Sequence, residues 1–209
     1  MFHFADSSVG FFEKVFLADN LPPIKHHANY SSPYKTPKKE ISFDGIFLLK
    51  DGKLQVLDKS FLRPNGLAFA PGEKFLYVND SFKKTIMRFE VRPDDTLANG
   101  QVFIDMNGDD APGVPDGMKV DLKGNVYCTG PGGVWIISPE GKHLATIKTP
   151  ERITNLAFGN ADGKMLFLTG RTGEGSQGVS LEFAATAASH IRLWLACRWG
   201  CRDQRPSRE

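Results

Sequence analysis

Long apolar runs, an excess of one charge and a cysteine framework are all missing from this sequence of 209 residues. No run approaches the roughly eighteen apolar residues of a transmembrane helix, which argues against a membrane span. Lys and Arg number 26 against 24 Asp and Glu, and a net charge of +2 argues against a nucleic-acid partner. The three cysteines are odd in number and far apart, so they indicate neither a disulfide framework nor a zinc site.

Glycine and proline are well represented, at 21 and 13 residues, and they separate short apolar runs. This spacing indicates many turns between short strands. Three segments repeat one order: an apolar run, a polar turn and a second β-rich run, which together predict a hairpin. The three hairpins span residues 64–80, 115–130 and 154–170. Outer pairs of strand-like runs lie at residues 45–57, 85–104 and 133–147.

Four short strands that recur about every 40 to 50 residues are the period of a β-propeller blade. We therefore predict an all-β fold, a partial propeller with about three and a half four-stranded blades. The first blade would lack its innermost strand, although Phe2–Phe4 could form an inner strand. The predicted blades span residues 1–60, 61–106, 114–150 and 151–170, and the last of them holds only its inner hairpin.

The segment 10–40 is longer than a hairpin loop needs, so it predicts a loop insertion in the first blade. Such a loop would overhang the mouth of the central channel as a lid. His26, His27 and Tyr34 are its candidate substrate-binding residues. Adjacent histidines in an extended loop point to opposite sides, which disfavours a shared metal for this pair.

The propeller pattern stops near residue 171, and the tail of residues 172–209 differs in composition. All sixteen lysines lie before this tail, whereas five of the ten arginines lie within it. We therefore predict a propeller domain over residues 1–171 and a non-family tail. A shifted reading frame or an unrelated join is the favoured interpretation. The alternative is a genuine C-terminal segment that is disordered, or weakly helical over residues 181–196.

Asn65 and Asp116 occupy the same place in successive repeats, each directly before a glycine. The first strand of a propeller blade lines the central channel, so both side chains are expected at one axial point. An amide oxygen and a carboxylate suit a hard cation such as Ca²⁺. The third repeat has Thr154 and Asn155 at the matching place. Alternatively, both sequences are ordinary turns in which the side chain caps its own backbone.

Five runs of residues follow one another in the order found in a known family. They are Arg63–Pro71, Leu76–Ser81, Gly113–Asp121, Gly132–Trp135 and Thr154–Gly159. Together they closely resemble the SMP-30/gluconolactonase/regucalcin-like family over roughly residues 40–171. Members of that family are six-bladed propellers that hydrolyse sugar lactones and related esters with one divalent cation.

The resemblance implies that this chain is part of a six-bladed propeller and a gluconolactonase-like hydrolase of small-molecule lactones or esters. The family's Asn ligand falls on Asn65, and its Asp, which binds metal and acts as general base, falls on Asp116. The implied cofactor is a divalent cation, most often Ca²⁺, with Zn²⁺, Mg²⁺ or Mn²⁺ as alternatives. The family's early Glu-Gly-Pro and Arg-x-Asn motifs have no counterpart here, so we expect weaker cation binding and impaired activity.

Three functions therefore stay open. The chain is a metal-dependent lactonase, a non-catalytic propeller that binds calcium or another ligand, or an inactive truncated gene product. The compartment is equally open between cytoplasm, periplasm and exterior, because any signal peptide would lie upstream of Met1. The sequence does not indicate an oligomeric state.

Overall fold

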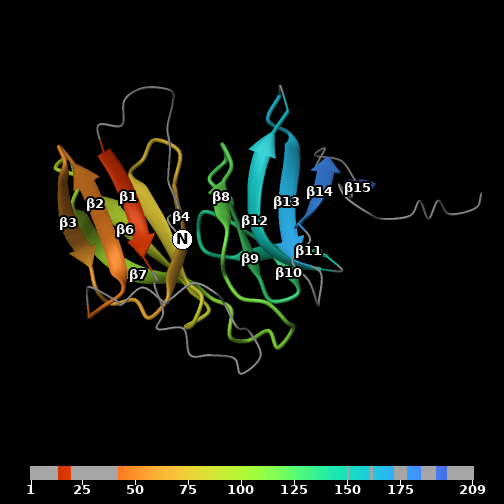
Figure 1. The fold of residues 1–209 in the computed structure, drawn as a ribbon, viewed down its shortest axis with the longest axis horizontal. Coiled ribbons are helices and arrows are strands. Elements are labelled where there is room, and N and C mark those ends of the chain that lie inside the picture. Colours follow the sequence, from red (N-terminus) through yellow and green to blue (C-terminus); the bar gives the residue numbers. More distant parts are fainter. Residues whose placement is uncertain are drawn as a thin grey trace, which may run out of the picture.

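Four antiparallel β-sheets make up the fold, which we describe from a computed structural model (Figure 1). Every element in the described part of the chain is a strand, and no helix there could cross a membrane. The structure describes residues 14–19, 42–149, 151–160, 162–171, 178–184 and 192–196. Within this set, only the backbone is described for residues 14–19, 171, 178–184 and 192–196.

In each sheet the strands pair in the order in which the chain reaches them, as a simple antiparallel meander. The first sheet comprises β1 (Lys14–Asp19), β2 (Gly45–Lys50) and β3 (Lys53–Asp58). The second comprises β4 (Pro64–Phe69), β5 (Phe75–Asp80), β6 (Thr85–Val91) and β7 (Leu97–Asp105). The third comprises β8 (Met118–Val120), β9 (Val126–Gly130), β10 (Gly133–Ile137) and β11 (His143–Lys148). The fourth comprises β12 (Arg152–Gly159), β13 (Met165–Arg171), β14 (Gly178–Ala184) and β15 (Arg192–Ala196).

The hydrophobic cores lie between the sheets, because successive residues of a strand point to opposite faces. In β5, Leu76 and Val78 face the first sheet, whereas Tyr77 between them faces the third. All three side chains are buried. The core between the first two sheets consists of Ile46, Leu48, Phe61, Leu67, Leu76, Val78 and Phe89. The next consists of Ala68, Tyr77, Ile86, Met106, Met118, Val126, Cys128, Trp135 and Ile137, and the last of Val134, Ile153, Leu156, Leu166 and Leu168.

The first strands of neighbouring sheets meet one another: β4 contacts β8, and β8 contacts β12. The sheets follow one another side by side across the molecule, each turned against the next (Figure 1). First strands that meet on one side, with meanders running outward, are the architecture of propeller blades. The predicted all-β, partial-propeller fold is therefore confirmed, and so are the predicted hairpins and outer pairs.

The first blade differs from its prediction, because a strand lies inside the predicted loop insertion of residues 10–40. This strand, β1, pairs with the whole length of β2, from Lys14 opposite Lys50 to Asp19 opposite Gly45. Its sequence, KVFLAD, contains a short apolar run within a long segment that otherwise has the pattern of a loop. Phe2–Phe4, the predicted inner strand, lies outside the described residues.

The fourth blade also differs, because it has four strands where only an inner hairpin was predicted. β14 and β15 lie in the tail for which weak helix or disorder was the alternative. The sequence of β14, GVSLEFA, alternates apolar and polar residues, which is the strand period and not the helical one. Whether residues 172–209 belong to the family stays a prediction.

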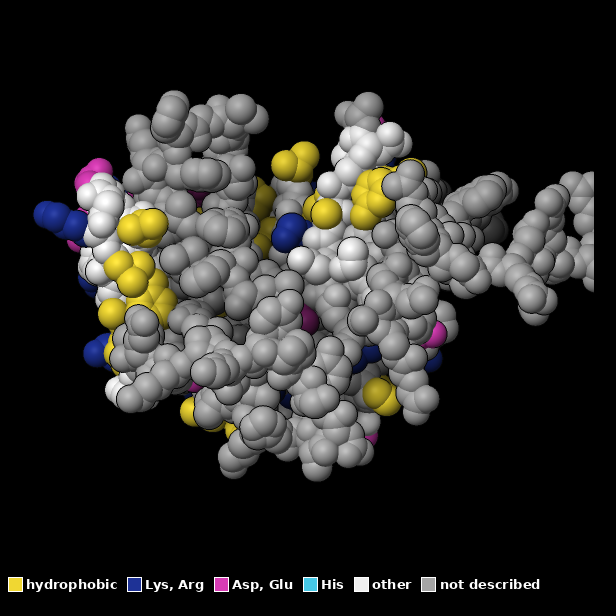
Figure 2. Space-filling view, in the orientation of Figure 1, with side chains coloured by type: hydrophobic (Ala, Val, Ile, Leu, Met, Phe, Trp, Pro, Cys, Tyr) yellow, Lys and Arg dark blue, Asp and Glu magenta, His cyan; other side chains and the backbone are white. Residues whose placement is uncertain are grey.

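At its outer face the first sheet exposes apolar side chains, which Figure 2 shows gathered over β2 and β3. Leu49 and Leu54 are partners in the β2–β3 register, and Val56 lies on the same strand as Leu54. Leu54 is 61% exposed.

Asp80, at the end of β5, is a buried carboxylate that joins two loops of the second blade. It is fully buried, and its carboxylate accepts hydrogen bonds from the backbone N–H groups of four residues. The donors are Leu62, Arg63, Phe82 and Lys83. A buried carboxylate is tolerated when hydrogen bonds to it replace water, and here they join the approach to β4 to the turn after β5.

We predict that Asp80→Asn lowers the free energy of unfolding by about 2–3 kcal/mol, because an amide NH₂ group would replace an oxygen that accepts N–H bonds. Urea denaturation measures the change. Asp105→Asn is the matched control: it makes the same substitution at the end of β7, where the side chain is exposed. Equal stability of the two variants would contradict the anchoring role.

Candidate cation site at the inner strands

Asn65 lies on one inner strand and Asp116 lies just before the neighbouring inner strand, and both residues are half-buried. Asn65 is the second residue of β4, and Asp116 lies two residues before β8. The backbones approach so closely that a Cβ on Gly66 would collide with the carbonyl oxygen of Asp116. The structure thus places the two predicted residues side by side, while their roles stay predictions.

The third repeat joins the same arrangement on the other side. The backbone N–H of Gly117 donates to the carbonyl oxygen of Thr154 at 2.9 Å. A Cβ on Gly117 would collide with Asn155. Both glycines are needed for close approach of two backbones, a use that only a residue without Cβ permits.

The amide of Asn65 is oriented by a hydrogen bond to the turn that follows β5. Its Nδ2 donates to Ser81 Oγ at 3.1 Å, and Ser81 Oγ in turn donates to the carbonyl oxygen of Pro115. Ser81 is buried. Because Nδ2 faces Ser81, Oδ1 is the end of the amide that points away from it and can act as an oxygen ligand.

The backbone of Asp116 is held on both sides of its Cα. Its N–H donates to Thr129 Oγ1 at 2.8 Å, and its carbonyl oxygen accepts from Asn79 Nδ2 at 2.7 Å. Thr129 also donates its own N–H to the carbonyl oxygen of Gly117 at 3.0 Å. The side chains of Asn79 and Thr129 are both buried, whereas Asp116 itself is half-buried.

Cys128 lies beneath this loop and is fully buried. Burial raises the pKa of its thiol to about 12, a hydrogen bond from Asn79 opposes the shift, and repulsion by the Asp116 carboxylate adds to it. The thiol is therefore neutral at physiological pH. Burial also shifts the pKa of Lys119, the second residue of β8, but lowers it because the charged form of a lysine is the protonated one.

The chemistry of the donors fits a hard cation in kind. Asn65 and Asp116 offer an amide and a carboxylate oxygen, and such oxygens are the ligands of Ca²⁺ and Mg²⁺, not of soft metals. Across the described residues, no three His, Cys, Asp or Glu side chains gather as a metal cluster. Ca²⁺ takes about six to eight oxygens. Asn65 and Asp116 could therefore supply at most part of such a shell.

Sequence reasoning missed the residues that hold the pair, namely Asn79, Ser81 and Thr129. Asn79 and Thr129 occupy equivalent places in their hairpins, a signal that the alignment of the repeats already contained. The proposed lid residues His26, His27 and Tyr34 lie outside the described residues.

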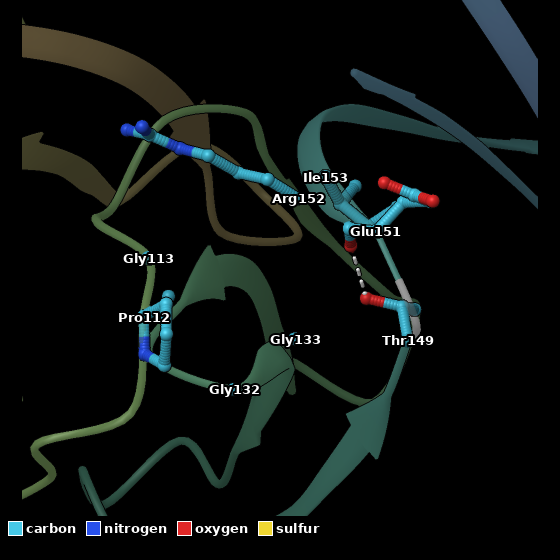
Figure 3. A pocket seen from close by; sticks show the side chains of 9 residues that line it. Pro112, Gly113, Gly132, Gly133, Thr149, Glu151, Arg152 and Ile153 are labelled. Carbon is cyan, nitrogen blue, oxygen red and sulfur yellow. Dashed lines mark hydrogen bonds between the residues drawn. The ribbon is translucent and has the colours of Figure 1, made fainter. Parts of the chain in front are cut away.

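A pocket of about 170 Å³ lies between the third and fourth blades (Figure 3). Its lining comes from the segments around Pro112 and Gly132 and from the connection of β11 to β12. That connection is fixed by a hydrogen bond from Thr149 Oγ1 to the carbonyl oxygen of Glu151 at 2.7 Å. The side chains of Glu151 and Arg152 extend in opposite directions (Figure 3). Charged groups therefore do not converge in this pocket as they would around an ionic ligand.

The fold and these inner strands define a partial β-propeller with a candidate oxygen-ligand site at its axis. The sequence profile of the SMP-30/Gluconolactonase/LRE-like region matches residues 32–172. The chain belongs to this family.

Among curated proteins, the chain is similar to a gluconolactonase of Zymomonas mobilis, with 31% identity over 140 residues. That alignment covers 63% of this chain and 39% of the relative. A pentonolactonase of Haloferax volcanii is 27% identical over 68% of this chain and 50% of its own length. The chain thus spans about half the length of these relatives, or less.

Solved structures of the family share the fold. A gluconolactonase of Xanthomonas campestris superposes with a TM-score of 0.62 at 29% identity, over 75% of this chain and 50% of that one. A regucalcin of Agrobacterium tumefaciens, described as a calcium-binding protein, superposes with a TM-score of 0.60 at 22% identity. That superposition covers 78% of this chain and 52% of the regucalcin chain, and it supports the fold alone.

We predict that Gly66→Ala destabilises the protein by about 1–3 kcal/mol, because two backbone segments must separate to admit the methyl group. The matched control is Gly108→Ala, where a Cβ would meet open space. Chemical denaturation compares both variants with wild type. A Gly66→Ala protein as stable as Gly108→Ala would contradict the close approach of β4 to Asp116.

The buried thiol predicts a pH effect that Cys128→Ala should remove. The folded-state pKa is raised, so the contribution of Cys128 is fully present below its unfolded-state pKa, near 9, and is lost as pH rises toward 12. Denaturation of both proteins between pH 8 and 11 should show their stability difference shrinking, by at most about 1.4 kcal/mol per pH unit. A constant difference would contradict a buried neutral thiol.

Proposed function

We propose that this chain carries part of the active centre of a metal-dependent hydrolase of sugar lactones. The observation that carries the proposal is the close approach of the segments that hold Asn65 and Asp116, at the start of neighbouring inner strands, where hydrogen bonds orient both residues. Membership of the family supports it, since the similar proteins include a gluconolactonase and a pentonolactonase.

In this proposal Asn65 Oδ1 and the Asp116 carboxylate would hold a hard divalent cation such as Ca²⁺, because both donors are hard oxygens. When bound, the cation supplies Lewis acidity that polarises the lactone carbonyl. Asp116 takes a proton from water as the water oxygen attacks the carbonyl carbon. The ring C–O bond then breaks, and the ring oxygen receives the proton as the hydroxy acid is released.

Fixing the backbone of Asp116 matters for this chemistry. A general base works only within hydrogen-bond reach of the proton it removes, and small displacements lower the rate steeply. Thr129 and Asn79 hold the two peptide groups that flank the Asp116 Cα, so few torsions remain to be ordered. This arrangement supports the assignment of the base to Asp116.

The test measures Ca²⁺ binding by equilibrium dialysis and hydrolysis of gluconolactone by acid release. We expect weak binding and slow hydrolysis that a chelator abolishes. Asp116→Asn should reduce binding by about tenfold or more, because ligand charge sets affinity for Ca²⁺, and should abolish hydrolysis.

Asp110→Asn is the matched control, because this exposed carboxylate lies in the turn before the Asp116 loop. It should bind and hydrolyse as wild type does. Equal Ca²⁺ binding by the Asp116→Asn and wild-type proteins would refute the site. Binding that depends on Asp116 without hydrolysis above the uncatalysed rate would refute the hydrolase in favour of a non-catalytic cation-binding propeller.

A further inference from the structure

Asn79 is a fully buried amide that makes hydrogen bonds in two blades at once. Its Oδ1 accepts the backbone N–H of Gly66 at 3.1 Å, within its own blade. Its Nδ2 donates to the carbonyl oxygen of Asp116 at 2.7 Å, in the next blade, and also contacts Cys128 Sγ at 3.4 Å. The orientation of the amide follows from these partners, since a backbone N–H requires an acceptor and a carbonyl oxygen requires a donor.

The strand register identifies the equivalents of Asn79 in the next two blades. Leu67 pairs with Val78, Met118 with Cys128 and Leu156 with Leu168. The residues that follow these partners are Asn79, Thr129 and Thr169.

Both threonines bond to backbone groups of the inner segment in their own blade. Thr129 Oγ1 accepts the N–H of Asp116, and Thr169 Oγ1 donates to the carbonyl oxygen of Asn155 at 3.5 Å. Asn79 also bonds within its own blade, where it accepts the N–H of Gly66, but its longer side chain reaches the neighbouring blade as well.

The junction between the second and third blades is therefore built differently from the junction between the third and fourth. Between the third and fourth blades, Gly117 N–H donates directly to the carbonyl oxygen of Thr154. The equivalent groups between the second and third blades are Gly66 N–H and the carbonyl oxygen of Asp116. Here the carboxamide of Asn79 bonds to both groups, beside the close contact of the two backbones.

We propose that Asn79 is a positioning residue that sets the separation of Asn65 and Asp116. The group it binds on one side belongs to the residue next to Asn65, and the group on the other side belongs to Asp116 itself. One planar amide, itself fully buried, thus ties the backbones of both residues. The inference rests on the proposed function for its consequence, since the separation matters only if the pair holds a cation.

The test replaces Asn79 by the residue that the next two blades use. Asn79→Thr retains a hydroxyl that can accept the N–H of residue 65, as Thr129 Oγ1 accepts that of Asp116, but it is too short to bond to Gly66 N–H and to the carbonyl oxygen of Asp116. We expect a folded protein in which Ca²⁺ affinity, measured by equilibrium dialysis, falls about tenfold, as for other residues that orient metal ligands. Cys128→Ser is the matched control, because it changes the third contact of Asn79 and leaves the bridge, and it should bind Ca²⁺ as wild type does.

A second measurement, amide hydrogen exchange by NMR, does not depend on the metal. In Asn79→Thr the amide of Gly66 should exchange about fivefold faster or more relative to that of Gly117, whose bond to Thr154 is intact. A global loss of stability would accelerate both amides together, so the ratio separates positioning from unfolding.

Unchanged Ca²⁺ affinity in Asn79→Thr, or a Gly66 to Gly117 exchange ratio equal to that of wild type, would overturn the positioning role. If the wild-type protein binds no Ca²⁺, the proposed function fails instead. The bridge between the blades is then judged by the exchange ratio alone.

Discussion

The close approach of the inner strands is the constraint on which the rest of the molecule depends. Gly66 lies against the carbonyl oxygen of Asp116, and Gly117 lies against Asn155, at distances that leave no room for a side chain. Neighbouring blades can therefore bring the first residues of their inner strands together. The same contact that closes the blades against one another brings Asn65 beside Asp116, so the candidate site is a product of the packing.

Polar groups at this junction are arranged so that burial does not leave them unpaired. Asn79, Asp80 and Thr129 are buried, and each bonds to backbone groups of loops that would otherwise lack partners. An unpaired buried polar group costs about 1–3 kcal/mol, so such a network favours one arrangement strongly over its neighbours. Stability and the geometry of the candidate site consequently share the same residues in the second and third blades.

Much of the fold was predictable, because strand periodicity and the repeat of the hairpins are local properties of the sequence. The inner pairs of residues 64–80 and 115–130 illustrate this, and so does the placement of Asn65 and Asp116 in equivalent positions. β1 and β14 were missed, since one lay inside a long irregular segment and the other in a region judged by its composition. The role of Asn79 depends on a contact 37 residues away along the chain, which no local pattern encodes.

Placing the cores between the sheets, and not within them, has a consequence for how the molecule gains and loses structure. The second sheet contributes Leu76 to one core and Tyr77 to the next, so neither face is complete without a neighbour. Among the described residues, the second sheet shares one core with the first sheet and another with the third, and the third sheet shares a further core with the fourth. Loss of either middle sheet would therefore expose two cores at once, so the junction that Asn79 bridges lies where the described packing is most interdependent.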